Sequence, residues 1–202
     1  KTTCIRSILR LISHEAGTIK FKGKDISKAE KSFKNSIGVV FDEGFFYDEL
    51  TLTQMKNLIA SSYSHWDNGA YTHYLDAFSL RPDQTISSLS RGMKMKFSLA
   101  LALSHHAELL IMDEPTSGLD PLVRKQFIEI LKEFMDQGGK AVFYSTHNTS
   151  DLDKAADMLV MIDNGKILFE EDKDMLLETH RLVKGKGLLP AQTKKLFLKV
   201  EQ

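Results

Sequence analysis

The chain has 202 residues, a formal net charge of zero and one cysteine. This length can bury one main core with a small subdomain, and the balanced charge argues against a nucleic-acid surface or a polybasic membrane patch. A single cysteine excludes an internal disulfide framework, and no apolar run approaches the roughly 20 residues that a membrane-spanning helix needs.

The chain opens with Lys1-Thr2-Thr3, followed by apolar residues at helical spacing, among which we expect Cys4 to pack. A lysine and a hydroxyl residue at a helix start are what the end of a phosphate-binding loop provides for phosphates and Mg²⁺. The glycines of the pattern G-x-x-x-x-G-K-[ST] and an initiator methionine are absent. We therefore expect that the sequence is truncated inside such a loop.

The next segments predict short elements. Gly23 marks a hairpin, and residues 36–41 form a buried strand that ends at Asp42. The aromatic loop 45–47 is either a docking surface or a cluster packed beneath the loop. Residues 51–80 indicate two helices broken near residues 67–69, with Thr53 as the first N-cap.

Ser90 precedes a helix expected over residues 97–105. The serine is either a simple N-cap or part of an anion site in which its hydroxyl, free amides and a nearby glycine face the ligand.

Four apolar residues, 109–112, are followed by Asp113, Glu114 and Pro115. The run is typical of a strand buried on both faces, as in a parallel sheet; a buried helix is the alternative, and the proline favours the strand. Two carboxylates at the carboxyl end of such a strand lie where open α/β sheets bind ligands. The alternative is a solvated strand end.

Beyond this strand, Asp120 and Pro121 have the pattern of an N-cap and first helical residue. Residues 141–145 predict another strand, followed by His147. A lone histidine is usually structural, but parallel strands would bring this one to the edge that carries Asp113 and Glu114. Residues 163–165 predict a hairpin turn, residues 172–179 a helix, and the tail two further strands.

In this order the motifs resemble those of the ABC ATPases, the nucleotide-binding subunits of ABC transporters, over residues 1 to about 177. Lys1-Thr2-Thr3 is similar to the end of Walker A, residues 110–114 to Walker B with its catalytic glutamate, and residues 117–120 to the D-loop. Residues 89–93 are similar to the LSGGQ signature, with Arg91 and Met93 in place of Gly and Gln. Asp42 stands where the Q-loop of the family has Gln.

The resemblance implies an α/β fold of the P-loop NTPase class, with a mostly parallel core sheet, an antiparallel β part and a small α-helical subdomain. We expect one domain over residues 1–202, with the helical subdomain at about 51–106 and a C-terminal extension at about 178–202.

The resemblance also implies the site residues. Glu114 is the expected general base, and His147 the residue that orients the water or the γ-phosphate. The residues expected to bind ATP are Lys1, Thr2, Thr3, Asp42, Ser90, Arg91, Gly92 and Asp120. Those expected to hold Mg²⁺ are Thr2, Asp113 and Asp42.

The function implied is ATP hydrolysis that energises transport of an unspecified substrate. The partners are a second ATPase subunit, identical or different, in a head-to-tail ATP-sandwich dimer, and separate transmembrane permease subunits; nucleic acid is not expected. This places the chain peripherally on the cytoplasmic face of the membrane. The alternatives are a non-transport ATPase of the same type and a nucleotide-sensing module with little turnover.

Overall fold

The computed structural model describes residues 1–41 and 45–179. The chain divides into two compact units, residues 1–156 and 157–202, and each is described by itself. Asp42, the expected tail strands and nearly all of the expected C-terminal extension lie outside the described residues.

A three-stranded parallel sheet forms the centre of the first unit. Its strands are β3 (Ile37–Phe41), β4 (Leu109–Asp113) and β5 (Ala141–Ser145), in that spatial order. The predicted strands and their parallel arrangement are thus confirmed. β4 is the middle strand, and its side chains from Leu110 onward are buried, as the unbroken apolar run predicts.

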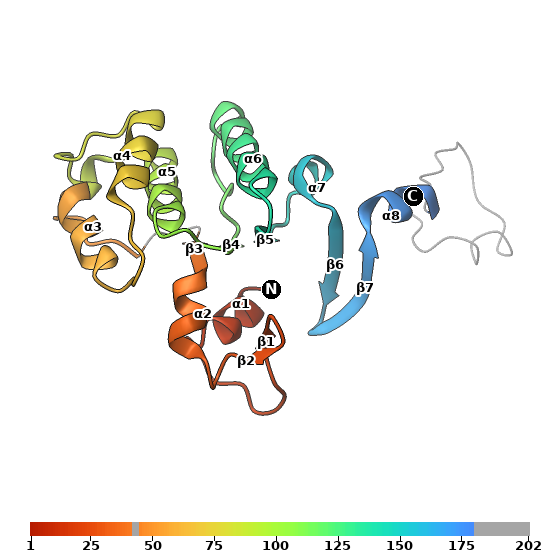
Figure 1. The fold of residues 1–202 in the computed structure, drawn as a ribbon. Coiled ribbons are helices and arrows are strands. Elements are labelled where there is room, and N and C mark those ends of the chain that lie inside the picture. Colours follow the sequence, from red (N-terminus) through yellow and green to blue (C-terminus); the bar gives the residue numbers. More distant parts are fainter. Residues whose placement is uncertain (42–44, 180–202) are drawn as a thin grey trace, which may run out of the picture. The chain divides into compact units, whose positions relative to one another are not determined.

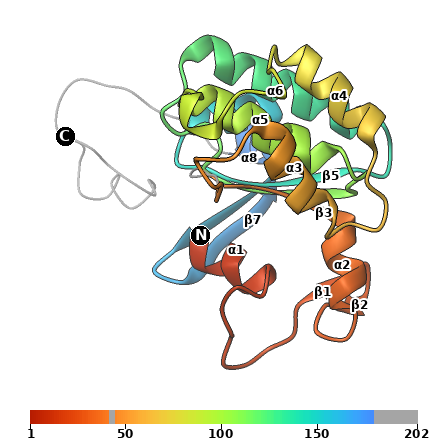
Figure 2. The same ribbon diagram turned by 90° about the vertical axis from the view of Figure 1, so that its left-hand side faces the viewer.

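Helices cover both faces of this sheet. Side chains alternate along the strands, so Val40, Leu110 and Met112 join one hydrophobic core while Ile37 and Ile111 join another. The larger core packs against α3, α4, α5 and α6, and the smaller against α1 and α2 (Figure 1). Figure 2 shows α1 on the side of the sheet opposite α5 and α6. The first unit is therefore a layered α/β structure.

The helical part comprises α3 (Leu52–Ala60), α4 (Asn68–Ala77), the 3₁₀ turn η1 (Ile86–Ser88) and α5 (Arg91–Leu103). The expected cap of α3 was wrong by two residues, because Thr51 and Gln54 form a reciprocal capping box and Thr53 lies inside the helix. Helix α5 begins six residues before the expected start, directly after Ser90, whose Oγ accepts a hydrogen bond from the Met93 amide. The N-cap prediction for Ser90 is confirmed.

The remaining elements of the first unit frame the sheet. They are α1 (Thr2–Ile8), β1 (Lys20–Phe21), β2 (Lys24–Asp25), α2 (Glu30–Ser36), α6 (Pro121–Asp136) and α7 (Thr149–Ala155). The predicted hairpin at Gly23 is confirmed, while α2 and α7 were not predicted. The prediction for Cys4 was wrong, because its side chain is exposed on α1.

The second unit contains β6 (Met158–Asp163), β7 (Lys166–Asp172) and α8 (Lys173–Thr179). The two strands pair antiparallel, and Asn164 and Gly165 between them both have positive φ, which confirms the predicted tight turn. None of the helices in the described part of the chain has the length and apolar character needed to traverse a bilayer.

Candidate active site

The ends of β4 and β5 form one edge of the parallel sheet. The register pairs Phe41 with Asp113 and Asp113 with Ser145, so the residues that follow these strands emerge together. The amide of Glu114 donates to the carbonyl of Ser145 at 2.9 Å, which extends the pairing by one residue beyond β4. Glu114 and His147 therefore meet at this edge, as the parallel arrangement predicts.

Both carboxylate oxygens of Glu114 have partners. The Lys1 Nζ lies 3.2 Å from Oε1, while the Nδ1 atom and the backbone amide of His147 lie 2.7 and 3.2 Å from Oε2. Lys1 also donates to the Thr146 carbonyl at 2.6 Å. A partly exposed carboxylate held between an ammonium group and an imidazole can accept a proton from water that approaches from solvent.

The backbone of Glu114 is in the left-handed region, with φ of 51°. Only a few per cent of non-glycine residues adopt this conformation, and those that do gather at functional sites. The carbonyl of Glu114 accepts from the Ser117 amide at 3.0 Å, so a tight turn holds the residue in place. The turn directs the Glu114 side chain toward Lys1 and His147.

Asp113 is buried beside this pair, with 7% of its surface exposed. Among residues 1–41 and 45–179, its Oδ1 atom and the hydroxyl of its neighbour Ser145 are both buried without a hydrogen-bond partner. A buried carboxylate oxygen without a donor fits the shell of a cation such as Mg²⁺, which prefers oxygen ligands. The exposed Thr2 and Thr3 lie in the first turn of α1, the helix that packs against β4.

A metal ion here would need ligands from outside the protein. Within residues 1–41 and 45–179, no group of three or more His, Cys, Asp or Glu side chains is arranged to hold a metal. Phosphate oxygens and water would supply the remaining ligands, as is usual for Mg²⁺ bound together with a nucleotide.

The signature segment lies against the D-loop of the same chain. The Arg91 Nη2 donates to the Ser117 Oγ at 3.4 Å, and a Cβ atom built on Gly118 would overlap the Arg91 guanidinium. Gly92 lies near Val123 of α6, with ordinary van der Waals spacing for an added Cβ. No hydrogen bond or ion pair that the structure describes joins Ser90 or Gly92 to Glu114.

Asp120 is used by the helix that follows it. Its Oδ1 accepts from the amides of Leu122 and Val123, each at 3.0 Å, so Asp120 caps α6. The predicted N-cap with proline at the first helical position is therefore confirmed.

Sequence reasoning missed a polar group close in the chain to Glu114 and His147. It consists of Thr116, Tyr144 and the buried Asp151, whose Oδ2 accepts from both hydroxyls at 2.7 and 3.0 Å. Only one sequence signal pointed to it, an aspartate four residues after His147.

Comparison with known proteins gives a consistent result. The sequence model of the family described as "ABC transporter" matches residues 1–117. A bacitracin transport ATP-binding protein of Bacillus licheniformis is 31% identical over 183 residues, covering 90% of this chain and 60% of that protein. A linearmycin resistance ATP-binding protein of Bacillus subtilis is 31% identical over 173 residues, covering 83% of this chain and 55% of that protein. The chain thus spans well under two thirds of the length of these relatives.

Solved structures give the same fold. The structure of an ATP-binding subunit of an ABC transporter superposes with a TM-score of 0.77 at 25% identity, covering 89% of this chain and 76% of that one. A dimeric ATP-binding cassette bound to ADP and phosphate superposes with a TM-score of 0.73 at 19% identity, covering 85% and 79%. These superpositions confirm the predicted α/β fold class with its parallel core sheet and antiparallel parts.

Proposed function

Since this chain belongs to the ABC transporter family of ATP-binding proteins, we propose that it binds ATP and hydrolyses it to drive transport through separate membrane subunits. The observation that carries the proposal is Glu114 at the end of β4, with Lys1 on one carboxylate oxygen and His147 on the other. A carboxylate can act as general base toward water, and an ammonium group can offset phosphate charge, so this sheet edge holds groups that support phosphoryl transfer to water.

Each side chain has a separate task in this reaction. Glu114 accepts the proton of the attacking water, and His147 fixes the Glu114 carboxylate through Nδ1 and the backbone amide. Lys1 offsets negative charge on the β- and γ-phosphates. Because the Lys1 ammonium group lies within ion-pair distance of Glu114, phosphates bound by Lys1 would compete with that carboxylate for the ammonium group.

Asp113 and Thr2 are the residues proposed to hold Mg²⁺, directly or through water. The unpartnered Oδ1 of Asp113 supports this assignment. Bound Mg²⁺ would neutralise charge on the phosphate oxygens. Asp42 is proposed as a further ligand on its sequence position alone.

The active form is proposed to be a head-to-tail dimer, in which Ser90 and Gly92 of one copy face the ATP of the other. Ser90 begins α5, a 13-residue helix whose N-terminal amides and dipole favour an anion. The absence of any described hydrogen bond between Ser90 and Glu114 within one chain is consistent with a role in trans. The dimeric cassette among the solved structures lends this arrangement further support.

A groove beside β3 is the proposed contact for the membrane subunits. It has a volume of about 210 Å³ and lies between Phe41, Phe45, Ile59 and Tyr63. Phe46 packs its ring 5.2 Å from that of Phe97, whereas Phe45 remains 73% exposed. One aromatic of the loop thus anchors it and another is available to a partner, which would hold the chain on the cytoplasmic face of the membrane.

The test is ATP hydrolysis by the full natural protein that contains this chain, compared with its Glu114→Gln variant. We expect slow turnover by the wild type, and ATP binding with dimerisation but little turnover by the variant. Wild-type protein that binds ATP without hydrolysing it would refute the enzymatic proposal. Phe45→Ala should retain basal hydrolysis and lose co-purification with the membrane subunits; retained co-purification would refute the proposed contact.

A further inference from the structure

A buried carboxylate lies four residues after His147 in the chain. Asp151, in the first turn of α7, has no exposed surface. Its Oδ2 accepts from two hydroxyls, the Oγ1 of Thr116 at 2.7 Å and the phenol of Tyr144 at 3.0 Å. These two hydroxyl oxygens are themselves 2.9 Å apart, so the three side chains form a closed triangle.

The other oxygen of Asp151 has only a charge partner. The Nε of Arg124 lies 3.9 Å from Oδ1, beyond hydrogen-bond distance, and both atoms are buried with no hydrogen-bond partner in the described part of the chain. Arg124 also donates from Nη2 to the Thr116 carbonyl at 3.4 Å. The carboxylate therefore depends on the two hydroxyls for its hydrogen bonds and on Arg124 for charge compensation.

The triangle connects the two loops that carry the reactive pair. Thr116 follows Glu114 by two residues in the β4–α6 connection, and Asp151 follows His147 by four residues. Tyr144 lies in β5, directly opposite Met112 of β4. The β4–α6 connection therefore contacts the segment after β5 at two points, through Glu114 and His147 and through Thr116 and Asp151 of α7.

The carboxylate fixes the direction of these hydrogen bonds, because its oxygens accept and the two hydroxyls donate. Removal from water also raises the pKa of the Tyr144 hydroxyl well above its ordinary value, so the phenol remains a donor at high pH. A buried carboxylate without donors is costly, which makes any rearrangement that separates the loops unfavourable.

We propose that Asp151 is a positioning residue, which holds the loops of Glu114 and His147 at the separation needed for hydrolysis by accepting hydrogen bonds from Thr116 and Tyr144. The proposal rests on the ATPase function proposed above. Within the described residues, the side-chain hydrogen bonds and the ion pair of Asp151 join it to Thr116, Tyr144 and Arg124 and not to Glu114 or His147. Its loss should therefore reduce kcat while ATP affinity stays nearly unchanged. Displacement of reacting groups by about 1 Å can cost on the order of 100-fold in rate, so we expect a kcat reduction of roughly 10- to 100-fold for Asp151→Ala.

Three variants isolate the effect in the full natural protein. Asp151→Ala removes the acceptor, and Asp151→Asn retains an acceptor oxygen of nearly the same size. Leu75→Ala creates a cavity in α4, where Leu75 is 2% exposed and far from the triangle in the chain, and it controls for general destabilisation. For each, kcat per folded molecule and equilibrium binding of a fluorescent ATP analogue are measured.

The proposal predicts that kcat falls in Asp151→Ala while the affinity for the ATP analogue stays within about threefold of wild type. Asp151→Asn should have most of the wild-type kcat, and Leu75→Ala should have a kcat close to that of wild type. Wild-type kcat in Asp151→Ala, or equal losses in the alanine and asparagine variants, would overturn it. A loss of kcat in Leu75→Ala equal to that in Asp151→Ala would overturn it as well.

A second readout does not depend on turnover. The ring signals of His147, assigned by comparison with His147→Gln, are recorded by NMR in wild type and in Asp151→Ala. A shifted His147 signal supports the tie between the loops, and an unchanged signal refutes it. If wild type fails to hydrolyse ATP, the proposed function fails while the His147 signal still decides the proposal on Asp151.

Discussion

The ammonium nitrogen of Lys1 lies 3.2 Å from the Oε1 atom of Glu114, so the proposed phosphate-binding residue pairs with the proposed general base. The contact is partly exposed, which weakens it, because water screens the charges. A triphosphate carries more negative charge than one carboxylate and can draw Lys1 away. Glu114 would then be free to accept a proton from water, held by His147 alone.

Replacement of Lys1 should weaken ATP binding. A hydrogen bond to a charged group is worth about 1.5–3 kcal/mol, so Lys1→Ala should raise the Kd for ATP roughly 10- to 100-fold. Equilibrium titration with a fluorescent ATP analogue measures the change. Lys28→Ala, which removes another exposed lysine, serves as the control and should bind like wild type. Equal Kd values for the two variants would refute the assignment of Lys1.

Glu114→Gln should stop the chemical step without loss of nucleotide. Glutamine retains the size of the side chain but cannot accept the proton, and positioned general-base catalysis contributes about 10²- to 10⁴-fold. We therefore expect the single-turnover rate of phosphate release to decrease by a factor of about 10²–10⁴ relative to wild type. ATP affinity should be equal or higher, because repulsion between Glu114 and the γ-phosphate is removed. A rate within threefold of wild type would exclude Glu114 as the base.

Gly118 and Arg91 should be energetically coupled. Gly118 has φ of 66°, where a Cβ atom costs about 1–2 kcal/mol, and an added Cβ would also displace the Arg91 guanidinium. Gly118→Ala should therefore lower the free energy of unfolding of the wild-type protein by at least about 1–2 kcal/mol. The decrease caused by Gly118→Ala should be smaller when Arg91 has been replaced by alanine. Urea denaturation of the four proteins gives the coupling. The same cost in both backgrounds would show that the two residues do not interact.

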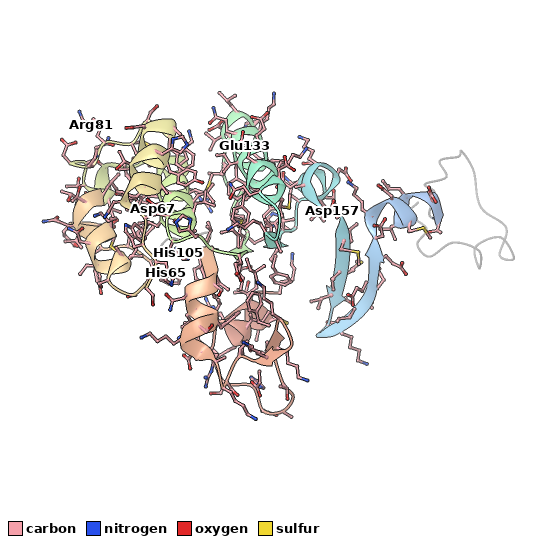
Figure 3. All side chains as sticks on the ribbon, viewed as in Figure 1. His65, Asp67, Arg81, His105, Glu133 and Asp157 are labelled. Carbon is pink, nitrogen blue, oxygen red and sulfur yellow. The ribbon has the colours of Figure 1, made fainter. Side chains whose placement is uncertain are left out.

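Acid should destabilise the protein through His105, a buried residue two positions after the end of α5 (Figure 3). Its ring stacks on Tyr63, with centroids 3.8 Å apart, and its Nε2 lies 2.9 Å from the Ile37 carbonyl. Burial lowers the pKa of His105 below its ordinary value of 6.5, although its two backbone hydrogen bonds oppose the shift. The neighbouring charges of His106 and Lys140 lower it slightly further.

The sign of the pH effect follows from this lowered pKa. The unfolded chain takes up a proton near pH 6.5 that folded His105 does not, so its contribution to stability is complete above pH 6.5 and decreases as the pH falls below it. The maximum slope is about 1.4 kcal/mol per pH unit. Thermal melts at pH 7.5 and 5.5 should therefore show a larger loss for wild type than for His105→Gln. Equal losses in the two proteins would contradict the prediction.

The sheet edge could be predicted because its signals are local. The apolar run before Asp113 and the proline after Glu114 fix the end of β4, and the strand before His147 fixes the end of β5; parallel pairing brings these two ends together. The caps at Ser90 and Asp120 followed from short-range hydrogen bonding in the same way.

The long-range contacts could not be predicted. The burial of Asp151 depends on hydroxyls from Thr116 and Tyr144, which helical or strand spacing does not connect to it. The contact of Arg91 with the D-loop likewise depends on how α5 packs beside α6. Cys4 was placed wrongly because apolar spacing identifies the stripe of a helix but not how wide a stripe its neighbours cover.

The parallel pairing of β3 with β4 also affects the order of events during translation. β3 ends at Phe41 and its partner begins at Leu109, so the intervening helical part must be synthesised before β3 can form any of these hydrogen bonds. At about 5–20 residues per second, the ribosome needs roughly 3–15 s for that segment. For those seconds the apolar side chains of β3 lack their partner strand and can be covered only by other parts of the unfinished chain or by chaperones. Slow codons between residues 42 and 108 would prolong their exposure.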